Sequence, residues 1–384
     1  MVIKVVPRIE GIGADAWDAC ANPDAATYDP FVSYAFLQAL EEAGTVGPGT
    51  GWHPQHLVLE QPGGEVAGVM PLYAKTHSQG EYVFDHAWAE ALHRVGGEYY
   101  PKLQAAVPFT PVPGRRFLTR PGPNAEEAEK LLARAAVAVA GRVGASSVHV
   151  TFLTESEWKR LGAEGFLQRT GQQFHWRNEG YRTFDDFLAT LASRKRKAIR
   201  KERGEAQVGL EIFSVSGVEI TETHWDAFFD FYMDTGSRKW GRPYLNRTFF
   251  SLLGQRLADR CLLVFARREE TLVAGALNLI GGDCLFGRYW GAVEHHPFLH
   301  FELCYYQAID YAIAHGLSRV EAGAQGEHKL ARGYLPETTY SLHWLADPRL
   351  EAAVARYLTE ERAEISEINM LLREHGPFKR GPMD

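Results

Sequence analysis

The sequence contains the same pattern twice, in the same order and with the same internal spacing. Residues 166–170 and 174–176 (FLQRT and FHW) correspond to residues 334–338 and 342–344 (YLPET and LHW). Upstream, residues 66–70 (VAGVM) correspond to residues 273–277 (VAGAL). Between the paired strings, each copy has a helix-like stretch that ends in glycine and then an apolar run. The repeat therefore predicts one α/β unit that is used twice.

Length and composition are compatible with this duplication. A chain of 384 residues favours two domains, which the repeat places at 1–183 and 184–384. The formal net charge of −7 gives no overall preference for nucleic acid or membranes, so any anion site must be local. Scattered cysteines, together with the lack of a signal-like or membrane-spanning apolar run, are typical of a cytoplasmic protein with reduced thiols.

Periodicity and turn residues predict an α/β (α+β) fold, with mixed sheets flanked by helices. The expected helices are 14–43, 125–143, 155–164, 185–203, 248–258, 301–315 and 349–373. The expected strands are 56–60, 66–75, 148–152, 262–266, 272–281, 284–289, 319–322 and 341–345. Residues 76–123 are rich in aromatic residues but show little periodicity. They predict a long loop of the first domain, for which we favour a binding role.

The predicted order of helices, meander, helix, strand, loop and strand resembles the GNAT acyltransferase fold, and duplicated GNAT-like halves resemble the Fem peptidyltransferases. Several strings are also similar to a bacterial FemAB-like family across nearly the whole chain. These strings are residues 77–85, 99–103, 108–112, 287–291, 300–307 and 321–329. The resemblance implies two tandem GNAT-like domains and transfer of an acyl or aminoacyl group to an amine, with acyl-CoA or aminoacyl-tRNA as the donor and without a metal.

The start of the helix at 301–315 departs from the GNAT pattern. GNAT enzymes usually have a glycine-rich loop here, whose backbone N–H groups bind the cofactor pyrophosphate. Residues 294–301 (EHHPFLHF) contain no glycine, and Pro297 has no N–H donor. This departure favours a Fem-like donor or a modified CoA site.

Glu302 is the first catalytic candidate, because it falls on the apolar stripe of this helix, near its N-terminus. A carboxylate in that position could accept a proton from an attacking amine or anchor the amine. The alternative is a structural ion pair with Arg288 or Lys329, or a helix cap. His300 and Tyr305, in the same segment, are candidate binding residues.

The loop at 323–329 follows a predicted buried strand, where open α/β sheets usually bind ligands. Gln325 and Glu327 are candidate binding residues, and His328 and Lys329 are candidate catalytic residues that could stabilise negative charge on a tetrahedral oxygen. A solvated turn is the alternative.

Arg288 and Trp290 fall on the predicted strand 284–289 and its continuation, where GNAT folds separate two strands to admit substrate. A β-bulge there would release backbone N–H groups for an oxyanion. Arg288 is expected to contact an anion. Core packing explains Trp290 equally well.

The basic run at 194–203 predicts a local anion site in a net acidic chain. Arg196, Arg200 and Arg203 share a helical face, and the Fem resemblance implies a phosphate-bearing substrate beside such a helix, such as a nucleotide-linked precursor or a tRNA. A solvated amphipathic face is the alternative.

The aromatic segment adds four acceptor-binding candidates: His77, Asp85, Tyr100 and Lys102. A loop that packs its own aromatic side chains is the alternative. Ser78 with His77 and Asp85 lacks the nucleophile-elbow context of a triad. Pro297 breaks the helical spacing that His295, His296 and His300 would need to bind a metal.

These candidates predict direct transfer of an acyl or aminoacyl group to an amine of a small or phosphate-bearing acceptor, in a cleft of the second domain. One alternative is a CoA-dependent N-acetyltransferase that acts on a small metabolite. The other is a non-catalytic module that binds nucleotide or RNA phosphate. The sequence leaves the donor and the acceptor open.

Overall fold

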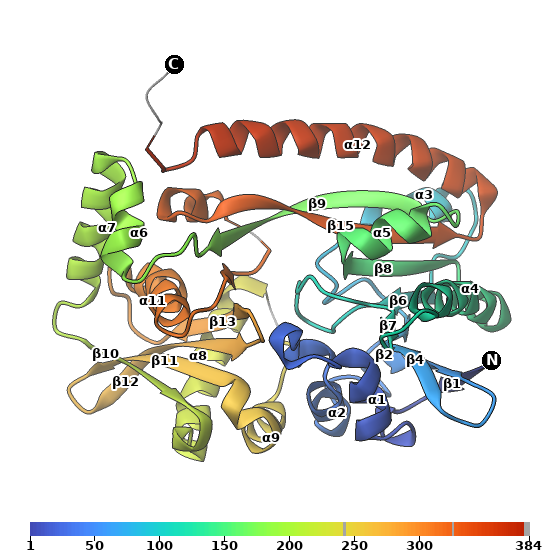
Figure 1. The fold of residues 1–384 in the computed structure, drawn as a ribbon, viewed down its shortest axis with the longest axis horizontal. Coiled ribbons are helices and arrows are strands. Elements are labelled where there is room, and N and C mark those ends of the chain that lie inside the picture. The colour runs from blue at the N-terminus through green and yellow to red at the C-terminus, as the bar shows by residue number, and fades with distance from the viewer. Residues whose placement is uncertain (241–242, 325, 380–384) are drawn as a thin grey trace. The chain divides into compact units, whose positions relative to one another are not determined.

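The computed structural model describes residues 1–240, 243–324 and 326–379, and they form two compact units (Figure 1). The first unit comprises Met1–Ala25, Phe31–Gln172 and Thr338–Ile368. The second comprises Ala26–Pro30, Gln173–Glu337 and the residues from Asn369 onward. This is a spatial division, which does not test the repeat boundary predicted at 183/184. That boundary stays a prediction.

The first unit contains two sets of paired strands. Strands β1 (Val2–Val6), β3 (His56–Glu60), β4 (Val66–Met70) and β7 (Leu118–Thr119) pair in that order, all antiparallel. In the second set, β8 (Ser147–Leu153) pairs with the end of β15 (Leu335–Leu345) and, in parallel, with β6 (Lys102–Ala105). Strands β5 (Tyr73–Lys75) and β2 (Trp52–Pro54) continue this set.

The helices of the first unit are α1 (Ala14–Ala21), α2 (Tyr34–Glu42), α3 (His86–Arg94), α4 (Ala125–Val143) and α5 (Glu155–Gly162). Helix α4 has the bounds that its pattern predicted. Glu126 and Glu127 lie in its first turn, where they complement the helix dipole, and Gly144 ends it with the left-handed φ of 66° that glycine adopts readily. Its buried alanine and leucine face packs in the core of this unit.

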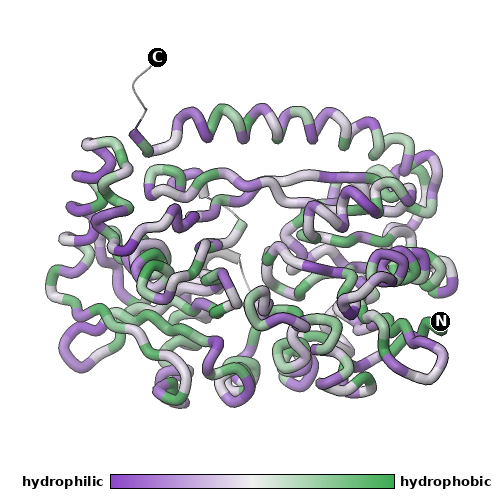
Figure 2. The backbone as a smooth tube through the Cα atoms, viewed as in Figure 1, coloured by the Kyte–Doolittle hydropathy of each residue, from purple (hydrophilic) through white to green (hydrophobic). Residues whose placement is uncertain are grey.

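The second unit is built on the antiparallel meander β10 (Glu211–Ser216), β11 (Cys261–Arg268), β12 (Thr271–Ile280) and β13 (Cys284–Ala292). Hydrophobic residues concentrate along it (Figure 2). Strand β14 (Arg319–Glu321) pairs in parallel with β13, and then antiparallel with the end of β9 (Leu167–Arg177). Its helices are α6 (Phe184–Thr190), α7 (Ser193–Ala206), α8 (Glu222–Trp240), α9 (Arg247–Leu257), α10 (Leu299–Phe301) and α11 (Gln307–Ala314).

Two single-turn elements complete the second unit. A π-helix, η6 (Glu302–Tyr306), joins α10 to α11, and a 3-10 segment, η7 (Glu327–Arg332), follows β14. The final helix, α12 (Pro348–Glu374), begins in the first unit and ends in the second. Short 3-10 turns lie at Ile9–Gly11, Ala25–Thr27, Pro30–Val32, Gly217–Glu219 and Ala258–Arg260.

The mixed α/β architecture is confirmed, with three differences of detail. The expected helix at 14–43 is two helices, because Pro23 and Pro30 interrupt it. The segment at 76–123 was expected to be a loop, which is wrong: it contains α3, β6 and β7, whose short lengths give little periodicity. The helix expected at 301–315 begins earlier and contains the π-helix, which sequence periodicity does not reveal.

Candidate functional site

The second unit has an opening where two parallel strands separate. Strand β14 pairs with β13 over only three positions, from Cys284 opposite Arg319 to Phe286 opposite Glu321. Strand β13 then continues to Ala292 without β14. Backbone that leaves a parallel ladder in this way exposes one face of the remaining strand to a ligand.

A β-bulge lies at the same point. Leu277 of β12 pairs with Tyr289, whereas the next residue, Asn278, pairs with Gly287. Arg288 is therefore the extra residue of the bulge, as the sequence suggested for this strand. The bulge twists β13 and changes the direction of the side chains that follow it.

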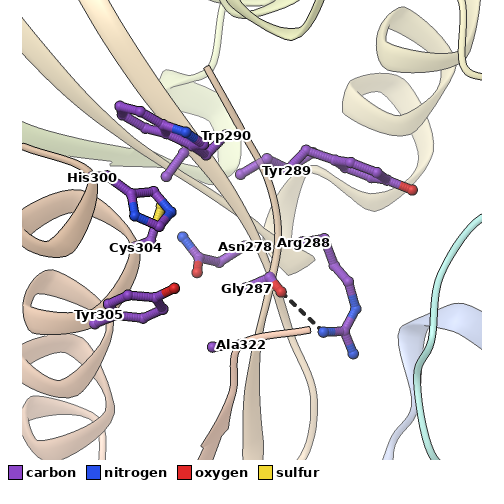
Figure 3. A pocket seen from close by; sticks show the side chains of 11 residues that line it. Asn278, Gly287, Arg288, Tyr289, Trp290, His300, Cys304, Tyr305 and Ala322 are labelled. Atoms are coloured by element: carbon purple, nitrogen blue, oxygen red, sulfur yellow. Dashed lines mark hydrogen bonds between the residues drawn. The ribbon is translucent and has the colours of Figure 1, made fainter. Parts of the chain in front are cut away.

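A cavity of about 120 Å³ occupies this opening, between the bulge and the start of the α10–α11 segment (Figure 3). Its lining comes from β12, from β13, from the helix start and from the residue after β14. The lining residues are Ala276, Leu277, Asn278, Gly287, Arg288, Tyr289, Trp290, His300, Cys304, Tyr305 and Ala322. Four sequence candidates are among them, namely Arg288, Trp290, His300 and Tyr305.

Aromatic rings form one wall of the cavity. The ring of His300 lies 5.0 Å from that of Trp290 and 5.3 Å from that of Tyr305, centroid to centroid. Such edge and tilted contacts hold the rings in fixed orientations. In this wall, residues of β13 and of the helix start face the same small cavity.

Tyr305 connects the cavity to a second sequence candidate. Its hydroxyl lies 3.0 Å from Nε2 of His328, which is on η7 and exposed. Burial raises the pKa of Tyr305 well above its ordinary value, so the hydroxyl keeps its proton. The pair can therefore pass a proton between the cavity and the solvent-facing imidazole.

Arg288 binds an internal carboxylate. Its Nη2 donates to Oε2 of Glu321 at 3.3 Å and its Nη1 donates to the carbonyl of Gly287 at 2.9 Å. Figure 3 shows the guanidinium turned away from His300 and Tyr305. The anion contact expected for Arg288 is thus provided by the protein itself, at a side chain that is only 2% exposed.

Lys329 is buried beside the opening. Its Nζ donates to the carbonyl oxygens of Gly323 at 3.0 Å and of Ala322 at 2.6 Å. Burial, and secondarily the Arg288 guanidinium, lower the pKa of Lys329 from 10.5 to about 7. An ammonium has three N–H donors, and these two bonds fix it next to Ala322, which lines the cavity.

Glu302 is fully buried but does not line the cavity. Arg203 donates to both of its oxygens, at 2.9 and 3.1 Å, and Gln207 and Gln307 donate at 3.1 and 2.7 Å. These are the contacts of the structural ion pair that the sequence left as the alternative, with Arg203 as the partner in place of Arg288 or Lys329. These four contacts hold the carboxylate in place, away from the cavity.

Backbone N–H groups at the helix start donate to carbonyl groups of the same segment. Leu299 N donates to the carbonyl of His296, while Phe301 N and Glu302 N donate to that of Phe298. Phe298 is left-handed, with φ of 61°. This arrangement differs from a pyrophosphate-binding loop, which directs such N–H groups at the ligand.

The basic run forms α7. Arg203 donates to Glu302, and Arg200 donates to Asp185 at 2.7 Å on the surface. Arg196 is half-buried. The exposed cations near the start of the helix are Arg194, Lys195 and Lys197.

The four candidates of the aromatic segment lie in the first unit, in a buried polar cluster. Lys102 is fully buried and donates to Glu81 at 2.6 Å and also to Asp85. The hydroxyl of Tyr100 lies 2.8 Å from that of Ser78, and His77 Nε2 lies 3.0 Å from the carbonyl of Thr50. The segment packs on its own polar and aromatic side chains, which is the second interpretation given above.

The remaining candidates contribute less. Gln325 lies outside the described residues, and Glu327 is exposed at the start of η7. Among the residues that the structure describes, no three His, Cys, Asp or Glu side chains are placed to hold a metal ion.

Seven of the eleven lining residues were not selected from the sequence, and Asn278 and Cys304 are among them. Asn278 is an isolated polar residue in the apolar strand β12, which was an available signal. Cys304 is half-buried, whereas the other cysteines are buried.

The geometry can be compared with known proteins. A family model named FemAB-like and described as peptidoglycan biosynthesis/recognition matches residues 8–380. The chain belongs to the FemAB-like family. The resemblance inferred from the sequence strings is thereby confirmed.

Solved structures with the same fold include FemX, which is 13% identical with a TM-score of 0.54, over 92% of this chain and 100% of that one. The C-terminal domain of a putative lysylphosphatidylglycerol synthetase from Agrobacterium fabrum is 10% identical with a TM-score of 0.53, over 90% and 96% of the two chains. The L-PGS from Bacillus licheniformis is 10% identical with a TM-score of 0.52, over 86% and 98%. At these identities the likeness shows the fold alone.

No curated protein matches the sequence. None of the helices within the described residues combines the length and the apolar character that crossing a membrane requires. Family and fold support acyl transfer as the reaction class.

Proposed function

We propose that this protein transfers an acyl or aminoacyl group directly to an amine of a small or phosphate-bearing acceptor, in the cavity of the second unit. One observation carries the proposal: the parallel strands β13 and β14 separate at a bulge, and a cavity opens there against a helix start. The bulge at Arg288 twists β13, and the side chains beside it line this opening.

Tyr305 and His328 have the proton-transfer role in this proposal. Their 3.0 Å contact allows the tyrosine hydroxyl to protonate the leaving group while the imidazole returns the proton. Lys329 lies beside the cavity, and its ammonium form stabilises negative charge that develops there. Glu302 holds helix η6 to α7 and takes no part in proton transfer.

Aminoacyl-tRNA is the donor that we favour over acyl-CoA. The local use of the N–H groups of Leu299 and Phe301, together with Pro297, weakens a pyrophosphate site of the GNAT kind. The exposed cations of α7 support a phosphate-bearing partner. Four free cysteines support a cytoplasmic location. An N-acetyltransferase that uses acetyl-CoA, and a phosphate-binding module without catalysis, are the competing functions.

Donor competition separates these functions. The protein is incubated with acetyl-CoA or with a mixture of aminoacyl-tRNAs, each with a panel of amine acceptors, and the transferred group is followed by mass spectrometry. Our proposal predicts transfer from aminoacyl-tRNA, and a large loss of transfer in Ala276→Leu, which fills the cavity.

The control is Ala163→Leu, the same substitution at an exposed position, the C-cap of α5 in the first unit. Transfer from acetyl-CoA alone would favour the N-acetyltransferase. Binding of uncharged tRNA without any transfer, unaffected by Ala276→Leu, would favour the binding module.

A further inference from the structure

Asn278 presents a buried hydrogen-bond acceptor to the cavity. The residue is 1% exposed and lines the cavity, and its Oδ1 has no hydrogen-bond partner among the residues that the structure describes. Its Nδ2 lies 3.5 Å from the carbonyl of Leu262, which sets the orientation of the amide. A buried acceptor left unpaired loses the hydrogen bonds it makes with water, so a ligand that supplies a donor is favoured at this position.

Gly287 keeps the space at this oxygen open. It is the register partner of Asn278 across the β12–β13 pair. A Cβ atom on Gly287 would lie 3.3 Å from Oδ1 of Asn278, tighter than an ordinary contact. Its backbone φ is not left-handed, so the glycine is required here for space and not for backbone conformation.

The charges around this oxygen disfavour a cation as the donor. No lining residue among those described is a carboxylate, and Glu321, behind the lining, is paired with Arg288. The titratable groups of the lining are Arg288, Tyr289, His300, Cys304 and Tyr305. On the elements behind the lining, Glu302 and Glu321 are paired with Arg203 and Arg288, and Glu327 is exposed. Because Arg288 is in the lining and no described lining residue is a carboxylate, an uncharged N–H group is favoured over an ammonium.

We propose that Asn278 binds the reacting amine of the acceptor in its uncharged form, with Oδ1 accepting one amine N–H and Gly287 providing the room. This inference rests on the proposed function and names the residue that selects its nucleophile. A neutral amine with one N–H held in this way keeps its lone pair available for attack.

The step balances without a carboxylate base. The amine nitrogen forms a C–N bond with the acyl carbon of the donor, and the C–O bond to the tRNA ribose breaks. One amine proton leaves, and the ribose oxygen gains a proton from the hydroxyl of Tyr305. His328 supplies the replacement proton to Tyr305 and, through solvent, takes up the proton that the nitrogen loses as the amide forms, so that no net proton is consumed. The engagement of Glu302 by Arg203 is therefore compatible with turnover.

Cys304 reports on occupancy of the same cavity. It is half-buried, whereas Cys20, Cys261 and Cys284 are buried and provide internal controls. The rate of its modification by methyl methanethiosulfonate, read by peptide mass spectrometry, is measured with n-butylamine and with methyl propyl ether. The two probes have equal numbers of heavy atoms, but the ether has no N–H or O–H donor.

The expected result is that the amine protects Cys304 about fivefold better than the ether, as one neutral hydrogen bond predicts. Protection by the amine should grow as the pH approaches the pKa of n-butylamine and the uncharged form accumulates. Each rate is compared with the probe-free rate at the same pH, which removes the effect of thiol ionisation.

Two variants test the assignment. Asn278→Leu removes the acceptor, and Gly287→Ala crowds it while leaving Asn278 in place. Both should reduce the amine preference to about onefold while protection by the ether remains, which also shows that the cavity is intact. Equal protection by amine and ether in the unaltered protein, or an amine preference that survives both variants, would overturn the inference.

The outcome is separable from that of the proposed function, because these measurements need no donor. An amine preference with no transfer from any donor would contradict the proposed function and leave the amine site standing. Transfer in Asn278→Leu with an unchanged KM for the acceptor amine would contradict the amine site and leave the transferase standing.

Discussion

Each unit contains a short pair of parallel strands that separate, but the space beyond the separation differs between the two units. In both, a parallel strand pair lasts only three positions, Leu103–Ala105 with Val148–Val150 in the first unit and Cys284–Phe286 with Arg319–Glu321 in the second. Beyond that point the second unit has a cavity. In the first unit, residues 106–117 leave β6 and run to β7, a strand of the four-stranded sheet, and this segment places Arg116 in the interior.

Arg116 is fully buried and satisfies several backbone carbonyls. Its Nε and Nη1 donate to the carbonyls of Thr151 and Arg115 at 3.0 Å, and its Nη2 donates to that of Val112. The carboxylate of Glu157 accepts the N–H groups of Arg116 and Phe117 at 2.9 Å. The opening of the first unit is therefore filled by chain and by a hydrogen-bonded cation.

A buried cation caps the free strand end in each unit. Thr151 follows the last parallel pair of β8, and Ala322 follows that of β14; the former carbonyl accepts from Arg116 and the latter from Lys329. Separated strands leave such carbonyls without ladder partners, and burial makes a donor obligatory. The difference teaches that the topology creates the opening, whereas the bulk of the inserted segment decides whether it can bind a ligand.

The largest effect is expected from Arg116→Met. Three buried carbonyls lose their donor, so the free energy of unfolding should fall by about 3–5 kcal/mol, measured by urea denaturation. Arg94→Met, at a side chain that is 76% exposed, is the matched control and should change it by less than about 0.5 kcal/mol. Similar small losses for both variants would mean that Arg116 does not hold the opening closed.

Glu302→Gln should follow, with a loss of about 2–3 kcal/mol in the free energy of unfolding, because Arg203 keeps Asp310 as a second partner. Turnover per folded molecule should be retained. In the first unit, Glu129 forms a comparable ion pair with Arg160 at 2.7 Å, near the start of α4. Glu129→Gln should cost only about 1 kcal/mol, since Arg160 is 29% exposed. A specific loss of turnover in Glu302→Gln would restore its role as the base.

Lys329 should make stability depend on pH. Burial lowers its pKa from 10.5 to about 7, so below pH 7 it is charged in both states and its burial costs free energy. Between these values the unfolded chain binds more protons, and the free energy of unfolding should rise by up to about 1.4 kcal/mol per pH unit. Lys75 of the first unit, whose pKa burial also lowers to about 7, should behave alike.

Denaturation across this range, in the unaltered protein and in Lys329→Met and Lys75→Met, checks the prediction. Each substitution should remove its own share of the rise, and a curve that is equally steep in both variants would exclude the two lysines as its cause. Absolute stability can change as well, so only the slopes are compared.

The smallest effect on stability is expected at the surface of α7. The double substitution Lys195→Glu with Lys197→Glu should alter the free energy of unfolding by less than about 0.5 kcal/mol. It should weaken tRNA binding and reduce the dependence of that binding on salt, measured by filter binding. Lys4→Glu with Lys159→Glu, at exposed positions of the first unit, is the charge-matched control. Equal losses in both pairs would indicate a nonspecific effect of net charge.

The sequence selected four residues that line the cavity, but it did not reveal their connections. The resemblance to the GNAT fold suggested a bulge beside Arg288, and Arg288, Trp290, His300 and Tyr305 were selected around that strand and the next helix. Their functional roles stay predictions. Whether the carboxylate of Glu302 could act on a substrate depended on its pairing with Arg203, which lies 99 residues away in the sequence. In the sequence, Asn278 is one polar residue in an apolar strand. That its oxygen is unpaired depends on which residues surround it in the fold, and the sequence does not show this.

The sequence by itself determined the duplication, the mixed α/β class and the elements with strong local patterns. The repeated strings became β9 and β15, and helix α4 matched its predicted bounds, because alternation, helical spacing and capping act between near neighbours in the chain. Only the tertiary structure decided that β9 ends in the second unit and β15 in the first, and which of the two openings was filled. These outcomes depend on contacts between segments far apart in sequence, where packing volume and the pairing of buried charges decide, and no local pattern encodes either.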